Sequence, residues 1–148
     1  MAFNILVVDD SATMRMVIKK TVEISGVPVG HFFEAAHGKE ALEILDNNWI
    51  DVLLSDINMP VMNGIELLAE IKNDENLKRI PVIFITTVAS DARMEEARRM
   101  GVAGYVTKPF QPEVIRGVLY KVLEDAYQQK VEVPTQSVAQ EKDDDLDF

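Results

Sequence analysis

The sequence contains no cysteine, so disulfide bonds, thiolate metal sites and cysteine nucleophiles are excluded. It also lacks an apolar run long enough to span a bilayer, because charged residues interrupt every hydrophobic stretch. Basic residues are in the minority, with 15 lysines and arginines against 25 aspartates and glutamates and a net charge of −10. This balance argues against a general binder of nucleic acid or of anionic membranes. The N-terminus shows no basic, cleavable leader, which predicts a cytoplasmic protein.

The 148 residues suit one domain with a substantial core and a short tail. Helical and strand patterns stop near residue 129, so we expect a domain at 1–129 and an acidic tail at 130–148. The tail is polar and aperiodic, which is typical of disorder. Its simplest role is to keep the protein soluble. Alternatively, Leu146 and Phe148 anchor this acidic segment to a partner or to the domain itself.

Short apolar runs alternate with longer amphipathic ones along the domain. The predicted strands are Ile5–Asp9, His31–Ala35, Val52–Asp56, Val82–Thr86 and Gly104–Thr107. The predicted helices begin near Ser11, Lys39, Gly64, Asp91 and Pro112, with Ser90 as a cap for the fourth. Five β/α units in strict alternation predict a doubly wound α/β fold, with a parallel sheet and helices on both faces. Ligands of such folds bind at the carboxyl ends of the strands.

Three acids lie at the carboxyl ends of two of these predicted strands. Asp9 and Asp10 end the first apolar run, and Asp56 ends the third. A cluster of carboxylates is costly unless a cation holds it together. Mg²⁺ prefers oxygen ligands, so these acids and the main-chain carbonyl of Asn58 form a candidate magnesium site.

The same strand ends carry residues suited to phosphoryl transfer. An aspartate beside a metal can act as a nucleophile toward phosphorus, which makes Asp56 a candidate phosphoryl acceptor. Lys108 can supply a fixed cation and Thr86 a hydroxyl donor for the phosphoryl oxygens. Pro109 biases Lys108 toward extended geometry, and the sequence leaves the isomer of the bond between them open.

These residues sit within a recurring set of motifs. The segments are Val7-Val8-Asp9-Asp10-Ser11, Glu34-Ala35, Gly38-Lys39-Glu40-Ala41-Leu42, Asp56-Ile57-Asn58-Met59-Pro60 with Gly64, Thr86, and Tyr105-Val106-Thr107-Lys108-Pro109-Phe110. In this order, over about residues 3–125, the chain resembles the receiver domain of two-component response regulators. It is most similar to the stand-alone chemotaxis, or CheY-like, type. The resemblance implies a flavodoxin-like five-stranded sheet of order 2-1-3-4-5, for which a chemotaxis receiver is itself a known example.

The resemblance also implies a role for each site residue. Asp56 would accept a phosphoryl group from a histidine kinase. Its implied partners are Asp9, Asp10 and the Asn58 carbonyl as Mg²⁺ ligands, Lys108 as the phosphoryl-pairing cation, and Thr86 and Tyr105 as switch residues. Phosphorylation would then bias a two-state protein-binding surface on the fourth helix, fifth strand and fifth helix. The implied protein catalyses only its own phosphorylation and dephosphorylation.

Two positions depart from the family pattern. Thr87 stands where a smaller residue is usual, and we expect it to crowd the phosphate entrance or to add a donor. Val88 is apolar at a position that is often polar. Our hypothesis is that Val88 limits water access and slows loss of the phosphoryl group.

Other classes of function use similar residues. A stand-alone phosphate shuttle or a receiver outside motility would need the same set. Magnesium-dependent phosphatases with an aspartate nucleophile usually carry two acids separated by one residue, whereas Asp9 and Asp10 are adjacent. A degenerate receiver would have lost an acid, the lysine or the hydroxyl, and all are present. The expected partners are a histidine kinase, a possible phosphatase and a downstream target such as the flagellar motor switch, with the protein itself a monomer.

Overall fold

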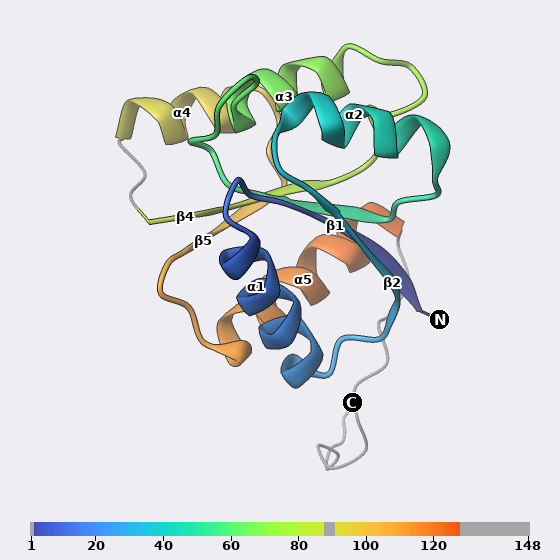
Figure 1. Cartoon of the computed structure of the whole chain (residues 1–148), viewed down its shortest axis with the longest axis vertical. Coiled ribbons are helices and arrows are strands. Elements are labelled where there is room, and N and C mark those ends of the chain that lie inside the picture. Colours follow the sequence, from blue (N-terminus) through green and yellow to red (C-terminus); the bar gives the residue numbers. More distant parts are fainter. Residues whose placement is uncertain (1, 88–90, 128–148) are drawn as a thin grey trace.

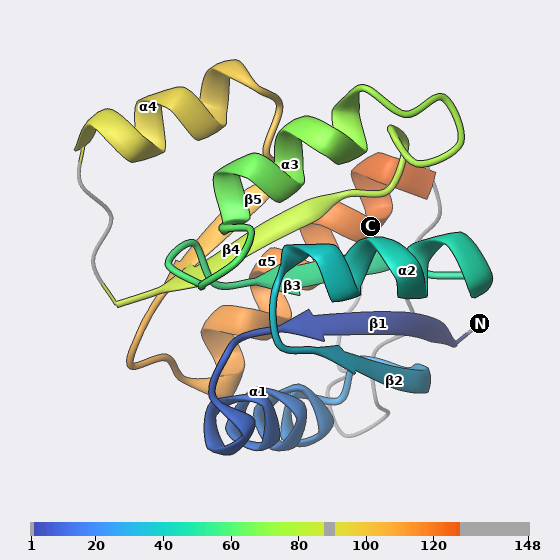
Figure 2. The ribbon, with the colours of Figure 1, turned by 45° about the horizontal axis from the view of Figure 1, so that its top comes forward.

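Five parallel strands form one sheet in the order β2-β1-β3-β4-β5 (Figures 1 and 2). The computed structural model describes residues 2–87 and 91–127. The strands are β1 (Phe3–Val8), β2 (Val29–Ala35), β3 (Val52–Ser55), β4 (Val82–Thr86) and β5 (Gly104–Thr107). The helices are α1 (Ala12–Ser25), α2 (Gly38–Asn47), α3 (Gly64–Lys72), α4 (Asp91–Arg99) and α5 (Pro112–Tyr127). The predicted doubly wound α/β fold and its strand order are confirmed.

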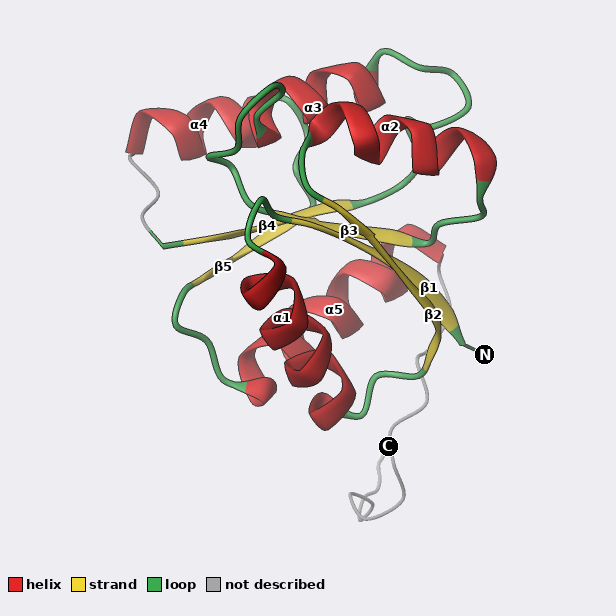
Figure 3. Cartoon of the chain, viewed as in Figure 1, coloured by secondary structure: helices red, strands yellow, loops and turns green. Residues whose placement is uncertain are grey.

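Helices cover both faces of the sheet, with α2, α3 and α4 on one face and α1 and α5 on the other (Figure 3). Alternate residues of each strand therefore enter different core clusters. In β1, Leu6 and Val8 pack toward α2 and α3, whereas Ile5 and Val7 pack toward α1 and α5. All four side chains are fully buried. Because both faces are covered, the inner strands appear in the sequence as continuous apolar runs.

Local capping fixes where the helices begin and end. The Ser11 hydroxyl accepts a hydrogen bond from the Met14 N–H and starts α1, which stops at Gly26 in the left-handed region (φ 88°). Asn63 and Glu66 form a reciprocal capping box at the start of α3. His37 caps α2, because its ring nitrogen accepts a hydrogen bond from the Glu40 N–H.

The observed element boundaries differ slightly from the predicted ones. β2 begins at Val29, because Phe3 pairs with it before the register shifts at Asn4. β3 ends at Ser55, and the Asp56 carboxylate turns back to accept the Ile57 N–H. The predicted Ser90 cap and the predicted tail at 130–148 lie outside the described residues. Within the described ranges, no helix is both long and apolar enough to cross a membrane.

Candidate functional site

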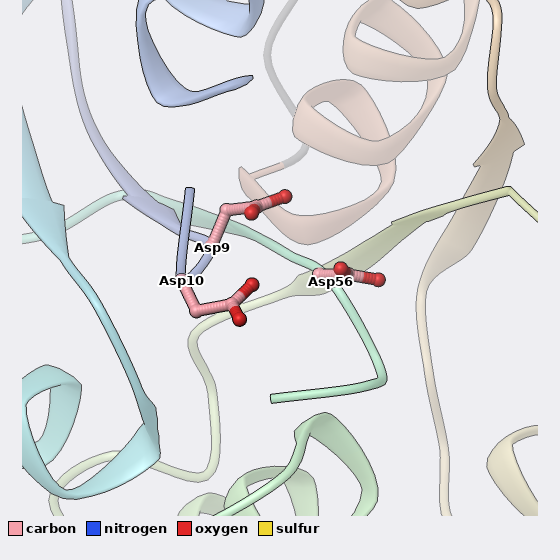
Figure 4. Close-up of side chains that lie close together, drawn as sticks. All are labelled: Asp9, Asp10 and Asp56. Atoms are coloured by element: carbon pink, nitrogen blue, oxygen red, sulfur yellow. The ribbon is translucent and has the colours of Figure 1, made fainter. Parts of the chain in front are cut away.

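Three acidic side chains meet where the chain leaves β1 and β3 (Figure 4). Val8 pairs with Ser55, and the Asp56 N–H donates to the Val8 carbonyl at 2.9 Å, so the two strands end at the same level. Asp9, Asp10 and Asp56 each offer a carboxylate oxygen within 4.8 Å of the others. Asp9 is buried, Asp56 is partly buried and Asp10 is exposed, so the cluster opens to solvent on one side.

Lys108 reaches this cluster from the end of β5. Thr86 pairs with Thr107, and the Lys108 N–H donates to the Thr86 carbonyl at 2.7 Å, which places the lysine beside the acids. Its Nζ lies 3.1 Å from an Asp9 oxygen and 3.6 Å from an Asp56 oxygen. The Lys108 side chain is only 9% exposed, so water screens these pairs weakly. The bond to Pro109 is cis.

Asp56 lies in a setting that disfavours its charge. Burial raises the pKa of Asp56 above its ordinary value, and the Asp9 carboxylate adds to that rise. Lys108 and the Ile57 N–H, which donates to the carboxylate at 2.7 Å, oppose the rise in this pKa. The balance leaves a carboxylate that is less stabilised than one in water.

The charge count at the cluster favours a bound cation. Three carboxylates converge, and Lys108 is the one cation of the described chain segments that forms an ion pair with any of them. Hard oxygen ligands with an opening to water are the donor set that Mg²⁺ takes, since this ion keeps several of its waters. The residues therefore fit the predicted metal.

Gly64 holds the loop after Asp56 close to α3. Its N–H donates to the Ile57 carbonyl at 2.8 Å, and a Cβ built on it would collide with the Asp56 carbonyl oxygen. Any side chain at this position would therefore push the start of the helix away from the acidic site.

The two predicted switch residues lie at different depths. Thr86 is fully buried at the end of β4, where it pairs with Thr107, the residue before Lys108. Tyr105 on β5 is 44% exposed, and the guanidinium carbon of Arg98 on α4 lies 5.9 Å from its ring centroid. Thr87 is exposed at the strand end. Val88 lies outside the described residues, so its predicted effect stays a prediction.

Two arginines near the site were missing from the sequence prediction. Arg15 donates to the main-chain oxygen of Asp9 at 2.6 Å and to Glu34 at 2.8 Å. Hydrogen bonds from Lys19 and Arg15 hold the pKa of Glu34 below its ordinary value. The position of Arg15 on the first turn of α1, just after the acids, was the available signal. Arg93 donates to the Asn58 side-chain oxygen at 3.2 Å across 35 residues, and no sequence pattern indicates that contact.

Comparison with known proteins identifies the class. A model of the response regulator receiver domain matches residues 5–120. The chain belongs to the response regulator receiver family. Chemotaxis protein CheY1 of Helicobacter pylori is 45% identical over 121 residues, which cover 81% of this chain and 96% of that one. Chemotaxis protein CheY of Pseudomonas aeruginosa is 41% identical over 121 residues, covering 82% and 96%.

Solved structures of receivers agree with this assignment. Chemotaxis protein CheY4 of Vibrio cholerae superposes with a TM-score of 0.74 at 33% identity, over 83% of this chain and all of that one. A CheY-like receiver from Methanospirillum hungatei gives 0.76 at 25% identity over 86% and 98%. This receiver is thus a two-component signalling regulator of the chemotaxis type, and not a classical enzyme.

Proposed function

We propose that the protein accepts a phosphoryl group on Asp56 and, in response, switches a protein-binding surface. One observation carries this proposal: Asp56 lies within a few ångströms of two other acids and 3.6 Å from the Lys108 ammonium. A nucleophilic carboxylate, oxygen ligands for a metal and a fixed cation are the parts that phosphoryl transfer needs.

The transfer exchanges one phosphorus bond for another. A carboxylate oxygen of Asp56 attacks the phosphorus of a phosphohistidine on the kinase, forming a mixed anhydride as the N–P bond breaks. The electron pair of that bond stays on the imidazole nitrogen, which takes up a proton. Lys108, held by Asp9 at 3.1 Å, pairs with the charge on the phosphoryl oxygens. Mg²⁺ bound by Asp9, Asp10, Asp56 and the main-chain carbonyl of Asn58 would offset the rest of that charge.

The switch would carry this local charge to the outer surface. In the proposed sequence, the Thr86 hydroxyl moves toward the phosphoryl group and the Tyr105 ring turns inward, away from Arg98. The exposed ring, with a cation against one face, supports Tyr105 as the movable residue. The surface formed by α4, β5 and α5 would then change its affinity for a protein target.

The relatives suggest the setting of this activity. Several are chemotaxis proteins, so we infer a cytoplasmic monomer that receives its phosphoryl group from a chemotaxis histidine kinase. A flagellar motor switch component is the proposed target, and a phosphatase would reset the signal.

Intact mass spectrometry tests the acceptor. After incubation with Mg²⁺ and acetyl phosphate, the wild type should gain a single phosphoryl adduct that is stable in acid and removed by hydroxylamine. Asp56→Asn should gain none, and a chelator in place of Mg²⁺ should prevent the adduct. Asp125→Asn is the matched control, because that acid is exposed on α5. A wild type that stays unmodified would contradict the proposal.

A further inference from the structure

A second site lies at the opposite end of the sheet from the acids. A pocket of about 550 Å³ opens between the end of α2, the loops that precede β3 and β4, and the end of α5. Its apolar lining comes from Leu45, Ile50, Leu77, Ile80, Trp49 and Tyr127. The connection from α2 to β3 and the last turn of α5 both lie on the side of the molecule where the chain begins (Figures 1 and 2). The pocket shares no residue with the proposed phosphorylation site, so a group that fills the pocket does not depend on the proposed function.

Trp49 is the most exposed large apolar residue in the described part of the chain, at 78%. Its position is nevertheless fixed. The indole N–H donates to an Asp51 carboxylate oxygen at 3.0 Å, and the Trp49 carbonyl accepts the Asn4 side-chain amide at 2.8 Å. The Tyr127 hydroxyl donates to the Asp51 carbonyl at 2.6 Å, so the end of α5 is bonded to the same residue that binds the indole. An aromatic face that is held rigid and left bare loses little entropy when a ligand covers it.

The chain itself supplies the nearest apolar segment. Tyr127 is the last described residue and lines the pocket, and the sequence continues as Gln-Gln-Lys-Val131-Glu-Val133-Pro134. Four residues span at most about 14 Å, so the pocket mouth is within reach of a chain that continues from Tyr127 to Val131. We propose that residues 131–134 dock against Trp49 and fill this pocket.

The composition of the segment matches the pocket. In an extended chain, Val131 and Val133 point to the same side, and Glu132 points to the other. The two valines can thus enter the apolar lining while Glu132 faces the rim. Arg79 lines the pocket, and its guanidinium has no ion-pair partner among the residues that the structure describes. The short tether keeps the segment at a high local concentration, whereas Leu146 and Phe148 would have to close a much longer loop.

Fluorescence gives a direct test, since Trp49 is the only tryptophan. We would compare the full chain with versions that end after residue 134 and after residue 129. The full chain and the version ending at 134 should show blue-shifted emission. Their acrylamide quenching should be lower by about twofold, because one ring face is covered. In the version ending at 129, Trp49 should show the emission and quenching of a fully exposed tryptophan. Equal quenching of all three chains would overturn the proposal.

Paired substitutions identify the segment that docks. Val131→Ser with Val133→Ser should restore full quenching in the complete chain, whereas Leu146→Ser with Phe148→Ser should leave the protection unchanged. All four positions follow α5 in the sequence, so the helices and strands that the structure describes should keep the same circular dichroism. Protection that is lost only with the second pair would overturn the proposal in favour of the distal motif. Protection that appears only at high protein concentration would overturn it in favour of a second copy of the chain.

Discussion

At the scale of single residues, the acidic site places a functional carboxylate where it costs stability. Asp56 has a raised pKa, with burial as the main cause. A group whose pKa is higher in the folded state than in the unfolded state contributes stability only at low pH. That contribution is lost as the pH rises through the folded pKa. At neutral pH the ionised Asp56 therefore lowers the free energy of unfolding.

Replacing this charge should stabilise the protein. Asp56→Asn keeps the shape and the acceptor for the Ile57 N–H, and Lys108 retains Asp9 as its partner. We expect a gain of up to about 1 kcal/mol at pH 7 without Mg²⁺, or roughly 3 °C in Tm. The gain should shrink as the pH falls toward 3.8, the ordinary pKa of the carboxyl.

Denaturant unfolding at several pH values measures this difference. Asp125→Asn serves as the control, because its exposed carboxylate faces Lys121 at 3.8 Å and should matter little. A destabilised Asp56→Asn at neutral pH would show that the Lys108 pair outweighs the cost of burial.

At the scale of elements, the start of α3 is built around the absence of a side chain. A methyl group on Gly64 would collide with the backbone oxygen of Asp56 and crowd the ring of Phe84. We expect Gly64→Ala to lower the free energy of unfolding by about 2 kcal/mol, and to slow phosphorylation by displacing Asp56. Thermal unfolding and the rate of adduct formation measure the two effects.

The same substitution in α5 should act in the opposite direction. Gly117 is exposed, and a Cβ there meets nothing within 4 Å. Gly117→Ala should therefore stabilise the protein by about 0.5–1 kcal/mol through helix propensity alone. Equal effects of the two alanines would show that α3 can shift without cost.

At the scale of the whole molecule, the sequence was enough to predict the architecture. Apolar runs buried on both faces and strict β/α alternation indicate a parallel sheet, and strand ends then locate Asp9, Asp56 and Lys108 at one edge. Contacts across the fold were not predictable. The hydrogen bond from Arg93 on α4 to Asn58 in the loop after β3 joins residues 35 apart, and no sequence pattern links these two positions.

The contacts at the opposite end of the sheet were not predictable from the sequence either. Trp49 lies in the loop before β3, and no sequence pattern predicts that Asp51 binds its indole and that Tyr127 in turn binds Asp51 beside a pocket. The motif residues thus indicated the edge of the sheet that carries the acidic site, and only the packed structure reveals the pocket at the opposite edge.

Locating the phosphoryl adduct tests the central claim most directly. Hydroxylamine converts an acyl phosphate to a hydroxamate on the same carboxyl and releases phosphate, so peptide sequencing by mass spectrometry can identify the modified residue among 25 acids. We predict a hydroxamate on Asp56 and on no other residue. A hydroxamate on Asp9 or Asp10, or an adduct on a histidine that hydroxylamine does not convert to a hydroxamate, would contradict the account.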